Sequence, residues 1–255
     1  MPFGVIFRAL YGTITIMINQ FQRLIALIGE EGYQRLKESA VIVFGIGGVG
    51  SSAAEALVRA GIGRIDIVDN DKVDITNINR QLIALHSTVG RDKVEVMKER
   101  MLDINPDVKV NTFRIFYNDE TCQHINLCDY DYIIDAIDTV TSKLLLIRKA
   151  KEENIRIISS MGTGNKFNPE MLEIADIRNT THCPLARVMR KELSNSGITE
   201  LKVIFSKESP RVPFFKESDA DNRGRHIAGS TSFVPPVAGM MMAAEVIKHL
   251  LNLNE

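Results

Sequence analysis

The sequence lacks tryptophan, and its 255 residues include only three cysteines and 6% aromatic residues. Three cysteines cannot form a disulfide framework, which favours a reducing compartment, so we expect a cytoplasmic protein. They also cannot supply a four-cysteine zinc site, and no structural zinc is expected. With 31 basic and 32 acidic residues, the chain has no excess of charge of either sign. This balance excludes a uniformly basic nucleic-acid-binding protein, but it does not exclude a local basic patch.

Long uninterrupted apolar runs are also missing. The apolar stretch 233–251 contains Glu245, Lys248 and His249, which a membrane-spanning helix rarely tolerates. Its apolar residues recur at helical spacing behind a Pro-Pro pair. We therefore expect a buried C-terminal helix and no membrane insertion.

The first 18 residues are apolar, with Arg8 as their only charge. They allow a signal peptide, but no small-residue cleavage site follows them. Met17 begins a more ordinary cytosolic start. We therefore interpret residues 1–20 as a dispensable or misassigned N-terminal extension.

Short apolar runs rich in β-branched residues alternate with helical patterns along the chain. Strands are expected at 41–44, 65–68, 108–113, 132–134, 155–158 and 201–205, and helices at 23–37 (broken at Gly29 and Gly32), 51–60, 93–101, 142–153 and 185–193. This alternation predicts the α/β class, with a Rossmann-like, doubly wound, mostly parallel sheet and a C-terminal extension that completes the domain. The polar loop 207–229 is long enough to be either functional or disordered.

A glycine-rich loop follows the first expected strand and precedes a helix. Gly45, Gly47 and Gly50 have the spacing of a dinucleotide fingerprint, and Gly48 adds a further glycine. Such glycines let the backbone approach a phosphate at a helix N-terminus. Asp69 ends the next strand, where a carboxylate can accept hydrogen bonds from ribose hydroxyls. A tight turn without a ligand is the alternative, but in this context a nucleotide is expected, and NAD, FAD and ATP all remain open at this point.

Further motifs follow the glycine loop in order and with compatible spacing. They are Asp69-Asn70-Asp71, Asn77-x-x-Arg80-Gln81, Gly90-Arg91-Asp92-Lys93-Val94 and Asp135-Ala136-Ile137-Asp138. Together with the glycine loop, they closely resemble the ubiquitin-activating-like adenylating enzymes, from about residue 23 to residue 164. The resemblance implies ATP binding and carboxylate adenylation, with 21–164 as the ATP-binding adenylation core.

The resemblance also implies a role for each matching residue. Asp69 would bind the ribose, and Asn77, Arg80 and Lys93 would contact the triphosphate. Asp138 would hold Mg²⁺. Arg23 stands where these enzymes have an arginine that reaches the partner subunit's nucleotide, which implies a homodimer.

The expected chemistry suits these residue types. A carboxylate that attacks the α-phosphate builds negative charge on phosphorus, and pyrophosphate leaves as an anion. Arg80, Lys93 and Mg²⁺ held by Asp138 would stabilise both charges by position and electrostatics. Taken alone, Arg80 or Lys93 is more often a solvated surface charge, and a lone Asp138 more often caps a helix.

The cysteines and the second half of the chain select a branch of this superfamily. Activators of sulfur carriers often have paired Cys-x-x-Cys zinc motifs, and this chain has none. Cys183 could transfer an acyl group, but a small residue before a helix is the simpler interpretation. The segments Asp176-Ile177-Arg178, 184–191, Val203-Ile204-Phe205-Ser206 and 229–235 look like the tRNA threonylcarbamoyladenosine dehydratase branch.

Enzymes of that branch use ATP to activate the threonine carboxylate of the modified adenosine beside the anticodon. The neighbouring ureido group then closes a ring, with net loss of water. The tRNA anticodon loop would be the macromolecular partner, a sulfur-relay protein is a further candidate partner, and residues 165–255 would face the tRNA and complete the dimer.

A basic stripe is the candidate RNA contact. Arg187, Arg190 and Lys191 fall on one side of the helix expected at 185–193, with Leu185, Val188, Met189 and Leu193 on the apolar side. Phosphate contacts from these groups would give salt-dependent tRNA binding. A solvated helix face is the alternative.

Three other functions compete with the dehydratase. An activator of a ubiquitin-like sulfur carrier would adenylate the C-terminus of a small protein. An NAD-dependent oxidoreductase fits the glycine loop but gives no joint role to Arg80, Lys93 and Asp138. A degenerate nucleotide-binding scaffold would not be expected to keep these phosphate-facing residues.

Overall fold

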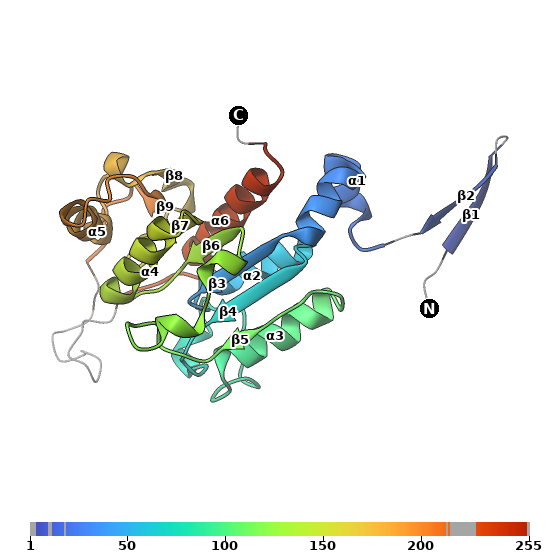
Figure 1. Ribbon diagram of the computed structural model, residues 1–255. Coiled ribbons are helices and arrows are strands. Elements are labelled where there is room, and N and C mark those ends of the chain that lie inside the picture. Colours follow the sequence, from blue (N-terminus) through green and yellow to red (C-terminus); the bar gives the residue numbers. More distant parts are fainter. Residues whose placement is uncertain (1–3, 10–11, 18, 213, 215–227, 254–255) are drawn as a thin grey trace.

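A computed structural model describes residues 4–9, 12–17, 19–212, 214 and 228–253 (Figure 1), and of residues 4–17 only the backbone. The parts of the 207–229 loop at 213 and 215–227 therefore lie outside the described residues. Within the described residues, β1 (Gly4–Ala9) and β2 (Gly12–Met17) form an antiparallel hairpin, and every other strand belongs to one sheet.

The sheet has seven strands in the order β5-β4-β3-β6-β7-β9-β8. They are β3 (Ala40–Phe44), β4 (Arg64–Val68), β5 (Thr112–Phe113), β6 (Tyr132–Asp135), β7 (Arg156–Ser160), β8 (Leu172–Asp176) and β9 (Lys202–Ser206). Only the β8–β9 pair is antiparallel. The doubly wound, mostly parallel sheet predicted from the sequence is confirmed.

Helices cover both faces of the sheet (Figure 1). They are α1 (Gln22–Glu38), α2 (Gly50–Arg59), α3 (Lys93–Ile104), α4 (Val140–Glu152), α5 (Pro184–Asn195) and α6 (Val234–Leu250). Side chains alternate along β3: Val41 and Val43 pack into one core with α2, α3 and α6, whereas Ile42 and Phe44 pack into a second core with α4 and α5. Burial on both faces explains why the central strands are continuous apolar runs.

Two expectations about the elements need correction, and one strand of the sheet was not expected. The strand expected at 108–113 is only Thr112–Phe113, because the Asn111 N–H donates to the Asp66 carboxylate (3.0 Å) instead of a carbonyl of β4. β8 was not expected, since its short sequence has no β-branched run, and it is defined by antiparallel pairing with β9. Gly29 kinks α1 at φ 75°, but the helix continues through Gly32.

The C-terminal helix α6 lies directly against α2. At Gly239, a Cβ atom would stand 2.1 Å from the Val49 carbonyl oxygen, so only glycine permits this approach. The buried C-terminal helix predicted from the sequence is therefore present, and it fixes the first turn of α2. Among the described helices, none is long and apolar enough to cross a membrane.

Candidate functional site

A cavity of about 810 Å³ opens at the carboxyl ends of the parallel strands. It lies at the point where the strand order reverses. From β3 the chain continues to β4 and β5 on one side, and then crosses to β6 on the other side of β3. Ligands of doubly wound proteins bind in this crevice. The lining includes Gly45, Gly47, Gly48, Asp69, Asn77, Arg80, Lys93 and Asp138.

The glycine loop is packed too tightly for side chains at two positions. A Cβ at Gly50 would stand 1.7 Å from the Gly45 carbonyl oxygen, and Gly45 itself has φ +87°. Gly50 therefore closes the turn beneath the cavity and is not part of its lining. At Gly48, a Cβ would stand 3.0 Å from Pro235 Cβ, so the loop is also held against the start of α6.

Charged groups gather at the end of β4. The Asp69 carboxylate accepts hydrogen bonds from the backbone N–H groups of Ile46 (2.6 Å) and Asp71 (2.8 Å). Burial raises the pKa of Asp69 above its usual value, and the Lys93 ammonium 4.0 Å away opposes that shift. Lys93 is buried and donates to Asp71 at 2.8 Å. A cation is thus held between two carboxylates inside the cavity.

A short 3-10 helix, η1 (Ile75–Asn77), positions Asn77 and Arg80. Asp74 caps it, and the Asn77 side-chain oxygen accepts from the Asp74 N–H at 3.1 Å. Arg80 is half-buried, and its Nη1 donates to the Thr76 carbonyl at 2.9 Å. Burial lowers the pKa of Arg80, but a guanidinium stays protonated. The cavity wall therefore contains a desolvated positive charge.

Asp138 lies on the loop between β6 and α4. Its carboxylate is exposed in the cavity and accepts from the Thr139 hydroxyl at 3.2 Å. Thr139, not Asp138, precedes the first residue of α4, and no side chain caps that helix. Helix capping therefore does not account for Asp138.

Directly behind Asp138 is a buried ion pair whose role the sequence analysis missed. Lys143 Nζ lies 2.9 Å from Asp135 Oδ2, and both side chains have no exposed surface. Ser159 donates to the same carboxylate at 2.5 Å, and Lys143 also donates to the Ile137 carbonyl at 3.0 Å. These bonds hold the loop that presents Asp138. A lysine at the fourth position of a helix gave no sequence signal of burial.

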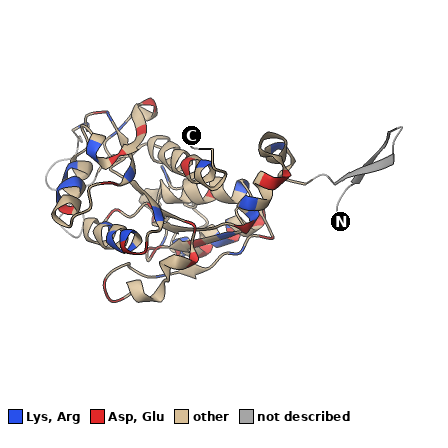
Figure 2. Ribbon diagram, turned by 45° about the horizontal axis from the view of Figure 1, so that its top comes forward, with Lys and Arg blue, Asp and Glu red and all other residues tan. Residues whose placement is uncertain are grey.

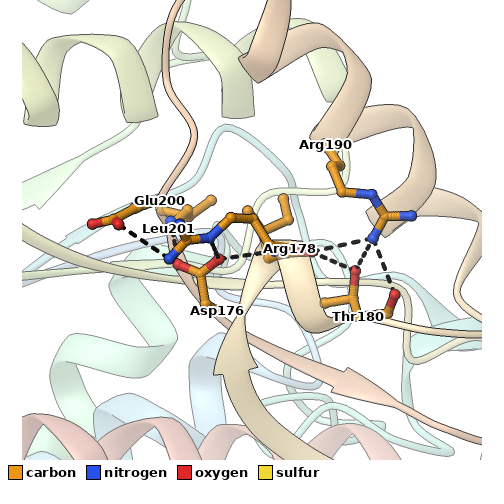
Figure 3. Close-up of polar contacts among 7 residues, drawn as sticks. Asp176, Arg178, Thr180, Arg190, Glu200 and Leu201 are labelled. Atoms are coloured by element: carbon orange, nitrogen blue, oxygen red, sulfur yellow. Dashed lines mark hydrogen bonds and ion pairs between the residues drawn. The ribbon is translucent and has the colours of Figure 1, made fainter.

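The three basic residues of α5 are not equivalent. The helix carries basic positions along its ribbon (Figure 2), and Arg187 and Lys191 are exposed. Arg190 is half-buried and turns back toward the protein (Figure 3), where Nη1 donates to the Thr180 hydroxyl at 2.6 Å and to the Thr180 and Ile177 carbonyls. The expected apolar face is wrong at Val188, which is 45% exposed.

Neither Arg23 nor Cys183 lines the cavity. Arg23 is exposed on α1, and Cys183 is a buried free thiol at the N-terminus of α5. In the part of the chain that the structure describes, no three His, Cys, Asp or Glu side chains are grouped to hold a metal ion.

Comparison with known proteins agrees with this geometry. The model of the ThiF family matches residues 21–255. The tRNA threonylcarbamoyladenosine dehydratase of Bacillus subtilis is 46% identical over 243 residues, which are 92% of this chain and 96% of that protein. The structures of the Escherichia coli enzyme of this name with AMP and with ATP superpose with TM-scores of 0.82 and 0.81, at 32% and 31% identity. Each alignment covers 92% of this chain and 94% of the other.

Replacing Lys143 by methionine should leave Asp135 as an uncompensated buried carboxylate. We expect the free energy of unfolding, measured by urea denaturation, to fall by about 3–5 kcal/mol. Lys151→Met, at an exposed position near the end of the same helix, is the matched control and should change stability by less than about 0.5 kcal/mol. Equal stability of the two variants would show that the pair does not hold this loop.

Proposed function

The chain belongs to the ThiF family, and from this premise we propose that it is an ATP-dependent tRNA threonylcarbamoyladenosine dehydratase. The observation that carries the proposal is the identity with the Bacillus subtilis dehydratase along nearly the whole of both chains. The cavity supports it, because a glycine loop, a buried carboxylate and two cationic side chains surround a volume of about 810 Å³.

The proposed reaction has two steps. A carboxylate oxygen of the threonyl group attacks the α-phosphorus of ATP, and the bond to pyrophosphate breaks. The ureido group of the same nucleoside then attacks the activated carbonyl carbon, so that AMP leaves and a ring closes. The nucleoside loses one water in total, and ATP becomes AMP and pyrophosphate. No protein nucleophile is required.

The walls of the cavity fit the two ends of ATP. The glycine loop leaves room for phosphates at the N-terminus of α2, where free N–H groups favour anions. Asp69 uses one oxygen for each of its two backbone donors, and each oxygen keeps a lone pair that can accept from a ribose hydroxyl. Asn77, Arg80 and Lys93, which also line the cavity, would contact the triphosphate.

Mg²⁺ fits the part of the cavity that Asp138 lines. Asp138 presents an exposed oxygen-donor carboxylate to the cavity, and Mg²⁺ is usually bound by one or two carboxylates together with substrate phosphates. When bound, the ion would neutralise charge on the phosphate oxygens. Asp135 and Lys143 would act as positioning residues that keep the Asp138 loop in place.

We also propose that the active form is a homodimer. Arg23 is exposed on α1 and does not line the cavity of its own chain. This placement suits an arginine that contacts the nucleotide of the partner subunit. The exposed apolar side chain of Leu27 on the same helix, 83% accessible, supports a subunit contact there.

The defining experiment supplies ATP, Mg²⁺ and tRNA that carries the threonylcarbamoyl group. Mass spectrometry of the digested nucleosides should show the loss of one water from the modified adenosine, with one AMP formed per turnover. A sulfur-carrier protein with a Gly-Gly C-terminus serves as the competing substrate. Adenylation of the carrier without loss of water from the nucleoside would contradict the proposal.

Mixing two inactive variants tests Arg80 and Arg23 together. Arg80→Ala should lower ATP–pyrophosphate exchange by at least about 10²-fold, since a group that stabilises charge is lost. Arg23→Ala should also lower it. If each site uses Arg80 of one chain and Arg23 of the other, half of the dimers formed at random from both variants contain one intact site. Mixing should then restore about a quarter of wild-type activity. No recovery would place Arg23 in the site of its own chain, and wild-type exchange in Arg23→Ala alone would place it outside the reaction.

The basic stripe on α5 gives a salt-dependent prediction. Replacing Arg187 and Lys191 by alanine should weaken tRNA binding and reduce the slope of log K against log salt concentration by about 1.5, because two phosphate contacts are lost. ATP affinity should not change. Arg35→Ala with Lys37→Ala, an exposed pair on α1, makes the same change in charge elsewhere. Identical slopes for the two double variants would remove α5 from the tRNA surface.

A further inference from the structure

Two phenylalanines form an exposed aromatic pair beside the cavity. The rings of Phe167 and Phe233 meet edge to face, with centroids 5.3 Å apart and an interplanar angle of 89°. Phe167 is 52% exposed and Phe233 is 36% exposed. The guanidinium of Arg211 lies over the Phe167 ring, 5.0 Å from its centroid. Large aromatic side chains gathered in the open mark a binding surface more often than scattered ones do.

The chain around this pair forms part of the cavity. Gly164 lines it before Phe167, and Ser230 and Pro235 line it on either side of Phe233. Backbone hydrogen bonds tie the segments together: Asn165 N–H donates to the Gly229 carbonyl at 2.7 Å. The aromatic pair therefore lies next in the chain to residues that line the proposed ATP site, on the side built by the second half of the chain, and neither ring is part of the lining.

Hydrogen bonds to Glu208 fix the backbone at Phe167. The Glu208 carboxylate accepts from the N–H groups of Phe167 and Asn168, both at 2.8 Å. Lys166 is buried and donates to the Glu208 carbonyl. Arg211 N–H also donates to the Asn165 carbonyl at 2.8 Å. A surface held this rigidly loses little conformational entropy when a ligand binds.

We propose that Phe167, Phe233 and Arg211 form a stacking platform for an unpaired base of the anticodon loop next to the modified adenosine. The inference rests on the proposed function. If the threonyl carboxylate reaches the α-phosphate inside the cavity, its flanking nucleotides remain outside it, and the platform offers them a surface next to the lining residues Gly164 and Pro235. Unpaired RNA bases bind by stacking on phenylalanine rings and arginine planes, and the positive charge of Arg211 suits the adjoining phosphates. Because exposed aromatic rings beside a positive charge suit a base and its phosphate, a protein partner is the less favoured occupant of the platform.

Substitutions that separate stacking from apolar volume test the platform in the full-length enzyme. Phe167→Leu and Phe233→Leu keep an apolar side chain but remove the aromatic face. Each should raise the Kd for threonylcarbamoyl-modified tRNA by about 5- to 150-fold, as expected for the loss of one stacked base. Phe167→Tyr and Phe233→Tyr keep an aromatic face and should retain wild-type affinity for this tRNA. The Kd for ATP should stay at the wild-type value in all four variants.

The control is Leu102→Ala on α3, at a side chain also 36% exposed, which should leave tRNA affinity unchanged. A tRNA with 2-aminopurine beside the modified adenosine gives a direct signal, because its fluorescence should be quenched by wild-type enzyme and less so by the leucine variants. Wild-type affinity in both leucine variants would overturn the platform. Absence of water loss in the wild-type enzyme would overturn the proposed function instead, because binding and turnover are measured separately.

Discussion

The close approach of the backbone at Gly45 and Gly50 is the constraint on which the site depends. With a Cβ at Gly50 only 1.7 Å from a carbonyl oxygen, no other residue allows the chain to turn from β3 into α2 at this point. The turn aims the N-terminus of α2 at the cavity, and α6 holds that first turn through Gly239. The C-terminal helix, which is distant in sequence but packs against α2, therefore helps to fix the phosphate-facing loop.

Two ion-paired lysines in and near the cavity, Lys143 and Lys93, differ in their surroundings, and the difference suggests different roles. Asp135 and Lys143 are fully buried, satisfied by Ser159 and the Ile137 carbonyl, and have no surface to offer a ligand. Such a pair serves to fix position. Lys93 faces the cavity between Asp69 and Asp71, where a triphosphate would compete with carboxylates for the same ammonium. Burial raises the pKa of Asp69, a sign that its charge is poorly solvated before a ligand arrives.

The second half of the chain supplies what a nucleotide site alone does not need. β8 and β9 extend the sheet, Gly164 and Gly229 line one side of the cavity, and the exposed rings of Phe167 and Phe233 lie in the chain segments that follow them. α5 adds exposed basic side chains on the same half of the chain. The division of roles, with phosphate chemistry in the first half and macromolecular contact in the second, is part of the proposed function.

The sequence by itself determined most of the strands and helices, though not β8 or the β1–β2 hairpin, and the motif positions around the cavity, because local periodicity and glycine spacing are written in neighbouring residues. Tertiary structure alone decided three other features. It showed that Lys143 is buried against Asp135, that Arg190 turns inward to Thr180, and that Phe167 meets Phe233. Arg190 shows the reason most clearly, because its helical position matches that of a solvated arginine. Its guanidinium has partners only because the fold brings two carbonyls and a hydroxyl near it. Burial and pairing depend on residues far apart in the chain, and no local pattern encodes them.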